Sequence, residues 1–177
     1  PLGLRLITPA TRLGDIARAG WLPAVLLVLI AVTRPRGIVT AAITIPWLLC
    51  AAFATLDGAL GFLKRKTSLG EFAAQAGWLV GAYMHTMSRA GRVPLGFAEP
   101  WVLLTAMHFH FAAFIVPLLA AKSAARSSAR FTFIELIAVA GSPLVAMGFV
   151  NQWPAVRAFG ALLLAIAAAL VSIRMLR

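Results

Sequence analysis

The chain has 177 residues, of which 62% are hydrophobic and 12% charged, and its mean hydropathy is +0.93. A soluble domain is nearer half apolar and a quarter charged, so this composition excludes an ordinary soluble protein and predicts a polytopic membrane protein. The net charge of +11 could suggest a nucleic-acid partner. The basic residues lie between apolar runs, however, as they do in membrane loops, so we expect membrane lipids and no nucleic acid as partners.

Six segments are apolar over about the 20 residues that a helix needs to cross the hydrocarbon core. In chain order they cover residues 15–33, 37–63, 68–87, 100–121, 131–150 and 154–175. Ser68 and Glu71 form a predicted capping box at the third segment, and Ala73, Gly77 and Gly81 have the spacing of a close helix contact. The predicted fold is therefore all-α: a transmembrane helical bundle of about six spans, formed by one domain over residues 1–177.

The loop charges predict an orientation. With an even number of spans, 11 of the 16 basic residues fall on one side of the membrane and 5 on the other. The larger group is Arg5, Arg12, Arg18, Lys64, Arg65, Lys66, Lys122, Arg126, Arg130, Arg174 and Arg177, and the smaller group is Arg34, Arg36, Arg89, Arg92 and Arg157. The positive-inside rule then places both termini in the cytoplasm.

The fourth segment holds the most informative residues, His108 and His110. At about 1.5 Å per residue, His108 lies roughly 13 Å inside the helix, near the middle of a bilayer. Polar groups at that depth are costly and usually line a cavity or carry out chemistry. Trp101, Thr105 and His108 share one helix face, whereas His110 lies about 200° around the helix, so the two histidines point to nearly opposite sides. A neutral ring bonded to a neighbouring helix is the alternative for each.

Other polar residues are expected near the outer ends of the segments. They are Tyr83, His85, Glu99, Asn151 and Gln152. Each could be an interface or cap residue, but together they are consistent with a cavity that opens to the outer half of the membrane.

The cytoplasmic half carries four of the five acidic residues, and two of them have a local explanation. Glu71 and Glu135 fit capping boxes, the latter with Thr132. Asp57 fits no cap, because it lies inside the second segment. It either pairs with a nearby basic residue at the interface or is an active-site acid.

Several familiar motifs are absent from the sequence. There is no Walker loop, no G-x-G-x-x-G, no G-x-S-x-G, no H-E-x-x-H and no C-x-x-C. We therefore expect no cofactor. The single cysteine, Cys50, excludes a disulfide within the chain.

Two stretches of this sequence carry a family resemblance. They are LTAMHFHFAAF at residues 104–114, followed by PLLA at 117–120, and SRAGRVPLGF at residues 88–97. The first is similar to the signature of the YndJ-like bacterial membrane proteins, approximately L-T-A-x-H-F-H-[YF]-A-G-F. Ala113 departs from it, since glycine is expected there. The resemblance implies a multi-pass protein of the bacterial inner membrane and draws attention to the histidines, but it supplies no reaction.

The leading hypothesis is an intramembrane acid–base enzyme without a cofactor or metal. It would be an isomerase or cyclase, including epoxide opening, acting on a lipophilic small molecule such as a polyketide or terpenoid. The candidate catalytic residues are His108, His110, Glu99 and Asp57, and the candidate substrate-binding residues are Thr105, Trp101, Phe109, Phe111, Trp47, His85, Tyr83 and Asn151. The alternative is a non-catalytic membrane protein that binds or transports a lipid or metabolite. The oligomeric state is left open.

Overall fold

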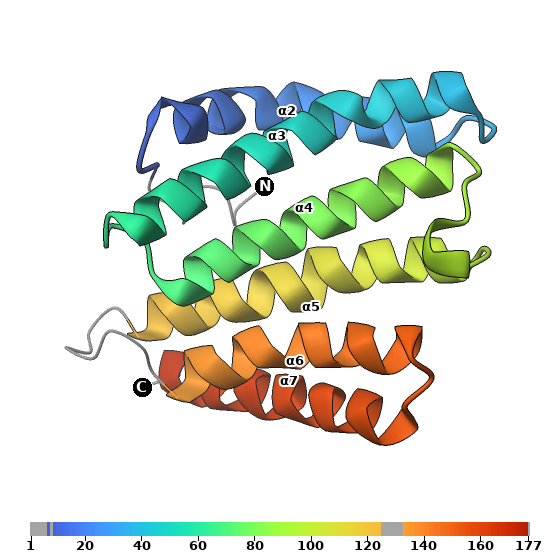
Figure 1. Cartoon of the computed structure of the whole chain (residues 1–177). Coiled ribbons are helices and arrows are strands. Elements are labelled where there is room, and N and C mark those ends of the chain that lie inside the picture. The colour runs from blue at the N-terminus through green and yellow to red at the C-terminus, as the bar shows by residue number, and fades with distance from the viewer. Residues whose placement is uncertain (1–6, 8, 125–132, 177) are drawn as a thin grey trace.

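A computed structural model describes residues 7, 9–124 and 133–176 as a bundle of long helices (Figure 1). The α-helices in these residues are α2 (Arg12–Val32), α3 (Ile38–Leu63), α4 (Leu69–Arg89), α5 (Trp101–Ala124), α6 (Phe133–Val150) and α7 (Pro154–Met175), with a short 3-10 helix, η1 (Pro94–Gly96). Each of the six predicted segments corresponds to one α-helix, and no strand occurs in the described part of the chain. The all-α prediction is confirmed.

Consecutive helices run antiparallel and pack mainly against their neighbours in the chain (Figure 1). One end of the bundle holds the α2–α3, α4–α5 and α6–α7 connections and is called the Glu99 end. The other holds the start of α2, the α3–α4 connection and the end of α7, and is called the Glu71 end.

Among the described helices, α2, α3, α5, α6 and α7 are long and apolar enough to cross a membrane, but α4 is not apolar enough. Helix α4 lies between α3 and α5, and 12 of its 21 residues are buried (Figure 1). Its buried polar residues include Gln75, His85 and Arg89. An interior helix needs less hydrophobicity than one that faces lipid, because its polar groups can face protein.

Local capping explains where α2 and α4 begin. Thr11 is extended, and its hydroxyl accepts a hydrogen bond from the Leu13 amide, so α2 starts three residues earlier than the predicted segment. The predicted capping box is confirmed: the Ser68 hydroxyl accepts from the Glu71 amide, and the Glu71 carboxylate accepts from the Ser68 amide. The second predicted box includes Thr132, which lies outside the described residues.

Glycines on α4 bring α5 close enough to position its histidines. A Cβ atom added at Gly77 would lie 2.5 Å from the backbone oxygen of Ala113, and one at Gly81 would lie 2.6 Å from Nδ1 of His110. The two helices therefore meet backbone to backbone. Although Ala113 stands where the family pattern suggests glycine, the close approach is present, because the glycine is supplied by the facing helix.

Candidate functional site

A pocket of about 420 Å³ lies between α4, η1, α5 and α6, in the half of the bundle toward the Glu99 end. Its walls are almost entirely hydrocarbon, and no charged residue lines it. The lining residues are Val80, Met84, Leu95, Phe97, Trp101, Leu104, Thr105, His108, Phe109, Val145, Ala146, Phe149 and Val150. Its volume is within the range of known small-molecule sites, and an apolar wall with few polar groups is typical of such sites.

His108 supplies a buried hydrogen-bonding atom in this pocket that has no partner in the described part of the chain. Its Nε2 atom is buried and has no hydrogen-bond partner among the described residues. The hydroxyl of Thr105, one turn earlier, donates to the carbonyl of Trp101 at 2.8 Å. A buried polar atom without a partner costs about 1–3 kcal/mol, so a bound molecule that bonds to Nε2 would recover that energy.

Aromatic rings form the wall of the pocket toward the Glu99 end. The rings of Trp101 and Phe149 lie 6.2 Å apart between centroids, and the guanidinium of Arg157 lies 4.8 Å from the Phe149 ring centroid. The Trp101 side chain is 52% exposed, so this wall lies at the surface of the bundle. The pocket is therefore open at the surface of the bundle on this side.

His110 belongs to a different part of the bundle. Its Nε2 accepts a hydrogen bond from the indole of Trp47 on α3 at 3.1 Å, and the two rings stack with centroids 5.8 Å apart. Because Nε2 is an acceptor, Nδ1 carries the proton and donates to the carbonyl of Ala106 at 2.7 Å. The two histidines diverge as their helical spacing predicts, and both nitrogens of His110 are engaged within the bundle.

Glu99 and His85 also lie outside the pocket lining. Glu99 accepts a hydrogen bond from the amide of Leu103 in the first turn of α5, and its other oxygen lies 3.8 Å from the guanidinium of Arg36. His85 is buried on α4, within electrostatic range of Arg89, Glu99 and His110. The Glu99 carboxylate therefore accepts a hydrogen bond at the start of α5, and neither Glu99 nor His85 lines the His108 pocket.

Asp57 has a structural explanation that the sequence did not reveal. It is 1% exposed, and its carboxylate accepts hydrogen bonds from the amides of Ala10 at 3.0 Å and Thr11 at 2.6 Å. Thr11 is the N-cap of α2, so a side chain of α3 holds the start of the preceding helix.

Three more predicted binding residues are placed apart from His108. Phe111 is 62% exposed on the surface of α5, and Tyr83 lines a separate groove on another face of α4. The amide of Asn151 donates to the carbonyl of Met147 at 2.9 Å, within its own helix turn. Of the twelve predicted site residues, the pocket brings together four: Trp101, Thr105, His108 and Phe109.

Sequence reasoning missed the pocket residues contributed by the other elements. Val80 and Met84 come from α4, Leu95 and Phe97 from the connection that includes η1, and Ala146 with its neighbours from α6. They are ordinary apolar residues of membrane helices, so no sequence signal distinguishes them from residues that face lipid.

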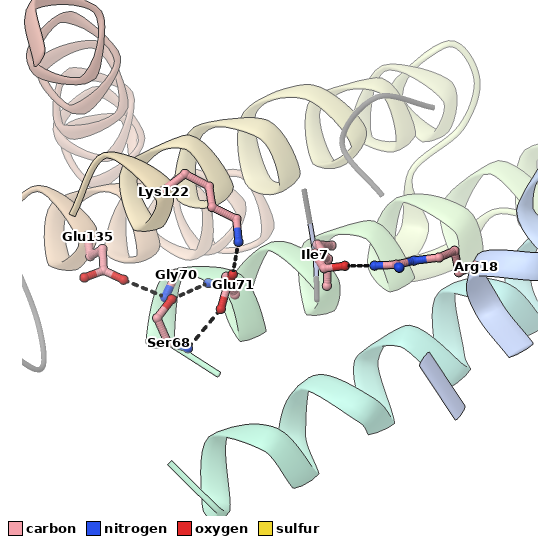
Figure 2. Close-up of polar contacts among 7 residues, drawn as sticks. All are labelled: Ile7, Arg18, Ser68, Gly70, Glu71, Lys122 and Glu135. Carbon is pink, nitrogen blue, oxygen red and sulfur yellow. Dashed lines mark hydrogen bonds and ion pairs between the residues drawn. The ribbon is translucent and has the colours of Figure 1, made fainter. Parts of the chain in front are cut away.

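Three charged residues at the Glu71 end, Glu71, Lys122 and Glu135, make contacts between helices (Figure 2). Lys122 on α5 forms an ion pair with Glu71, the capping residue of α4. Glu135 on α6 is buried and accepts a hydrogen bond from the amide of Gly70 at 3.3 Å, in the first turn of α4. The Glu135 carboxylate therefore contacts the start of a neighbouring helix, whereas Thr132, its partner in the predicted capping box, lies outside the described residues.

No group of three or more His, Cys, Asp or Glu side chains in the described ranges is arranged to hold a metal ion. The fold is that of a helical membrane protein, and it contains an apolar pocket beside His108. The family model described as YndJ-like protein matches residues 1–177, and the chain therefore belongs to the YndJ-like family. No curated protein and no solved structure matches the chain.

Proposed function

We propose that this protein is a multi-pass protein of the bacterial inner membrane that binds a neutral lipophilic small molecule beside His108. One observation carries the proposal: an unpartnered, buried imidazole nitrogen lies in the wall of an otherwise apolar pocket. Since no charged residue lines that pocket, a charged ligand would lose its hydration without compensation. A terpenoid or polyketide with one hydroxyl or carbonyl group has the required chemistry.

The membrane arrangement in this proposal has six spans, with α4 as the sixth, and both termini in the cytoplasm. Five helices are apolar enough to face lipid, and α4 is covered by its neighbours. The positive-inside rule supports the orientation, because seven of the twelve basic residues in the described ranges lie toward the Glu71 end. The His108 pocket then lies in the outer half of the membrane.

A second candidate function is isomerisation or cyclisation by the same histidine. The free Nε2 atom favours it, because an unpartnered imidazole can accept or donate a proton. Neither His110 nor Glu99 lines the pocket, so we propose a single-base reaction. His108 would remove a proton from one carbon, the C–H electron pair would shift the double bond, and the same proton would return to another carbon, with no oxidant required.

Binding is tested with two related lipophiles, farnesol and farnesene, its dehydration product, which lacks the hydroxyl group and has one more double bond. Purified protein in detergent is titrated with each, and tryptophan fluorescence reports binding. We expect His108→Leu to weaken farnesol binding about fivefold, the value of one lost hydrogen bond, and to leave farnesene binding within about twofold. Equal affinities of the parent protein and His108→Leu for farnesol would contradict the proposed role of Nε2.

The enzymatic candidate requires a separate measurement. A β,γ-unsaturated steroid ketone is incubated with the protein in deuterated buffer, and ultraviolet absorbance follows formation of the conjugated isomer. Mass spectrometry then checks that the product carries no deuterium, as return of the same proton requires. We expect conversion above the buffer rate that is lost in His108→Leu. If the parent protein binds the ketone but converts it no faster than buffer does, the non-catalytic binding function is retained and single-base isomerisation of such ketones is rejected.

A further inference from the structure

A second hollow lies between α3 and α4 at the Glu99 end and shares no lining residue with the His108 pocket. It is an open groove of about 810 Å³. Ile38, Ala41, Ala42 and Ile45 of α3 form one wall, and α4 with the connection that follows it forms the other. The first four residues have the i, i+3, i+4, i+7 spacing of one helix face, so they make a continuous apolar wall.

The groove faces outward from the bundle. Ile38 is 77% exposed and Val93 is 57% exposed, and Tyr83 and Ile45 are also exposed. Thr86 lies in the groove, but its hydroxyl donates to the carbonyl of Ala82 at 2.9 Å and accepts from Thr44. The walls therefore suit a hydrocarbon chain rather than a polar ligand.

Arg92 is the charged residue of the groove. It is exposed and forms no salt bridge with any described residue. The Glu99 end contains one carboxylate, that of Glu99, which lies beside Arg36. The other four acidic residues, Asp15, Asp57, Glu71 and Glu135, belong to α2, α3, α4 and α6 toward the Glu71 end. Among the described residues, the guanidinium of Arg92 therefore has no ion-pair partner.

The start of α3 borders the same groove. Gly37 is its N-cap and provides no side-chain hydrogen bond, and the first turn contains no acidic residue. The amide of Gly37 donates to the carbonyl of Arg89, the last residue of α4, at 2.8 Å, and Ile38, the first helical residue, lines the groove. An anionic group in the groove would therefore pair with the guanidinium of Arg92.

We propose that this groove binds an anionic phospholipid, with the phosphate group beside Arg92 and one acyl chain along the α3 wall. A groove at a helix end that combines exposed apolar walls with unpaired positive charge is complementary to a lipid, whose phosphate lies at the membrane interface and whose chain extends into the hydrocarbon. A soluble anion would use the positive charge but leave the apolar walls uncovered. The occupant is therefore a lipid of the outer half of the membrane.

Native mass spectrometry of the whole protein in detergent tests this assignment. The probes are phosphatidylglycerol and phosphatidylcholine with identical oleoyl chains, and inorganic phosphate. We expect one phosphatidylglycerol to bind about fivefold more tightly than phosphatidylcholine, and Arg92→Gln to remove that preference, since one basic residue near an anionic headgroup accounts for about this factor. The matched control is Arg157→Gln, an arginine of the same end outside the groove, which should keep the preference.

A groove-filling variant, Ala42→Phe, tests the place of the acyl chain. Because this side chain would occupy the α3 wall, we expect it to weaken the binding of both lipids, while farnesol binding at the His108 pocket stays within about twofold. Equal binding of the two lipids, or equal effects of the Arg92 and Arg157 variants, would overturn the proposal. So would tight binding of inorganic phosphate alone, or a dimer that Ala42→Phe dissociates, since the occupant would then be a soluble anion or a second copy of this chain.

Discussion

Replacing Asp57 tests whether its carboxylate stabilises the fold or takes part in catalysis. Its buried carboxylate accepts hydrogen bonds from two consecutive backbone amides, those of Ala10 and Thr11. A Cβ atom added at Gly14 would lie 2.6 Å from Oδ2 of Asp57, so this oxygen also packs tightly against the first turn of α2. Asp57→Ala would leave both amides without their acceptor and detach the start of α2 from α3.

The expected loss in the free energy of unfolding follows from these two hydrogen bonds. A hydrogen bond to a charged group contributes about 1.5–3 kcal/mol net, and both donors are only partly buried, so water can replace part of the loss. We expect Asp57→Ala to lower the free energy of unfolding by about 3 kcal/mol. Asp57→Asn should lose about half as much, because the amide keeps one acceptor oxygen but turns an N–H group toward the second donor.

The assay is reversible unfolding in detergent, followed by circular dichroism, with farnesol affinity measured on the folded protein. Asp15→Ala is the control, since Asp15 is an exposed aspartate of the same helix start and should contribute only about 0.3–1 kcal/mol through the helix dipole. The structural explanation would be wrong if Asp57→Ala unfolded like the parent protein and yet lost farnesol binding or ketone conversion.

Three further substitutions test the packing and the pocket. Gly77→Ala should lower stability by about 1–2 kcal/mol in the same unfolding assay, because the added methyl meets backbone atoms of α5, whereas Gly37→Ala, with open space around it, should stay within about 0.5 kcal/mol. Ala146→Phe should fill the His108 pocket and reduce farnesol affinity at least about tenfold, while the unfolding midpoint is maintained. Trp47→Phe should cost about 1–2 kcal/mol of stability, since it removes the donor to His110.

Several properties could be predicted from the sequence because they depend on residues close together in the chain. Composition defined the membrane class, and apolar length with local caps such as Ser68 and Glu71 gave the six helices to within a few residues. Helical periodicity alone predicted that His108 and His110 diverge. The pattern around these histidines also indicated the YndJ-like family, which the family match confirms.

Tertiary structure decided which residues meet. Trp47 and His110 are 63 positions apart and form a hydrogen bond, and Asp57 bonds to amides 46 and 47 positions earlier. The His108 pocket likewise needs α4, α5 and α6 together, so the expected convergence of His85 and Glu99 on it could not be judged from their depth in the sequence.

The physical reason is that depth along a helix follows from its length, whereas the direction of a side chain depends on how the helix is rotated against its neighbours. That rotation is determined by close contacts such as Gly77 with Ala113 and Gly81 with His110. These contacts join separate helices, and no local pattern specifies which small residue will face which backbone.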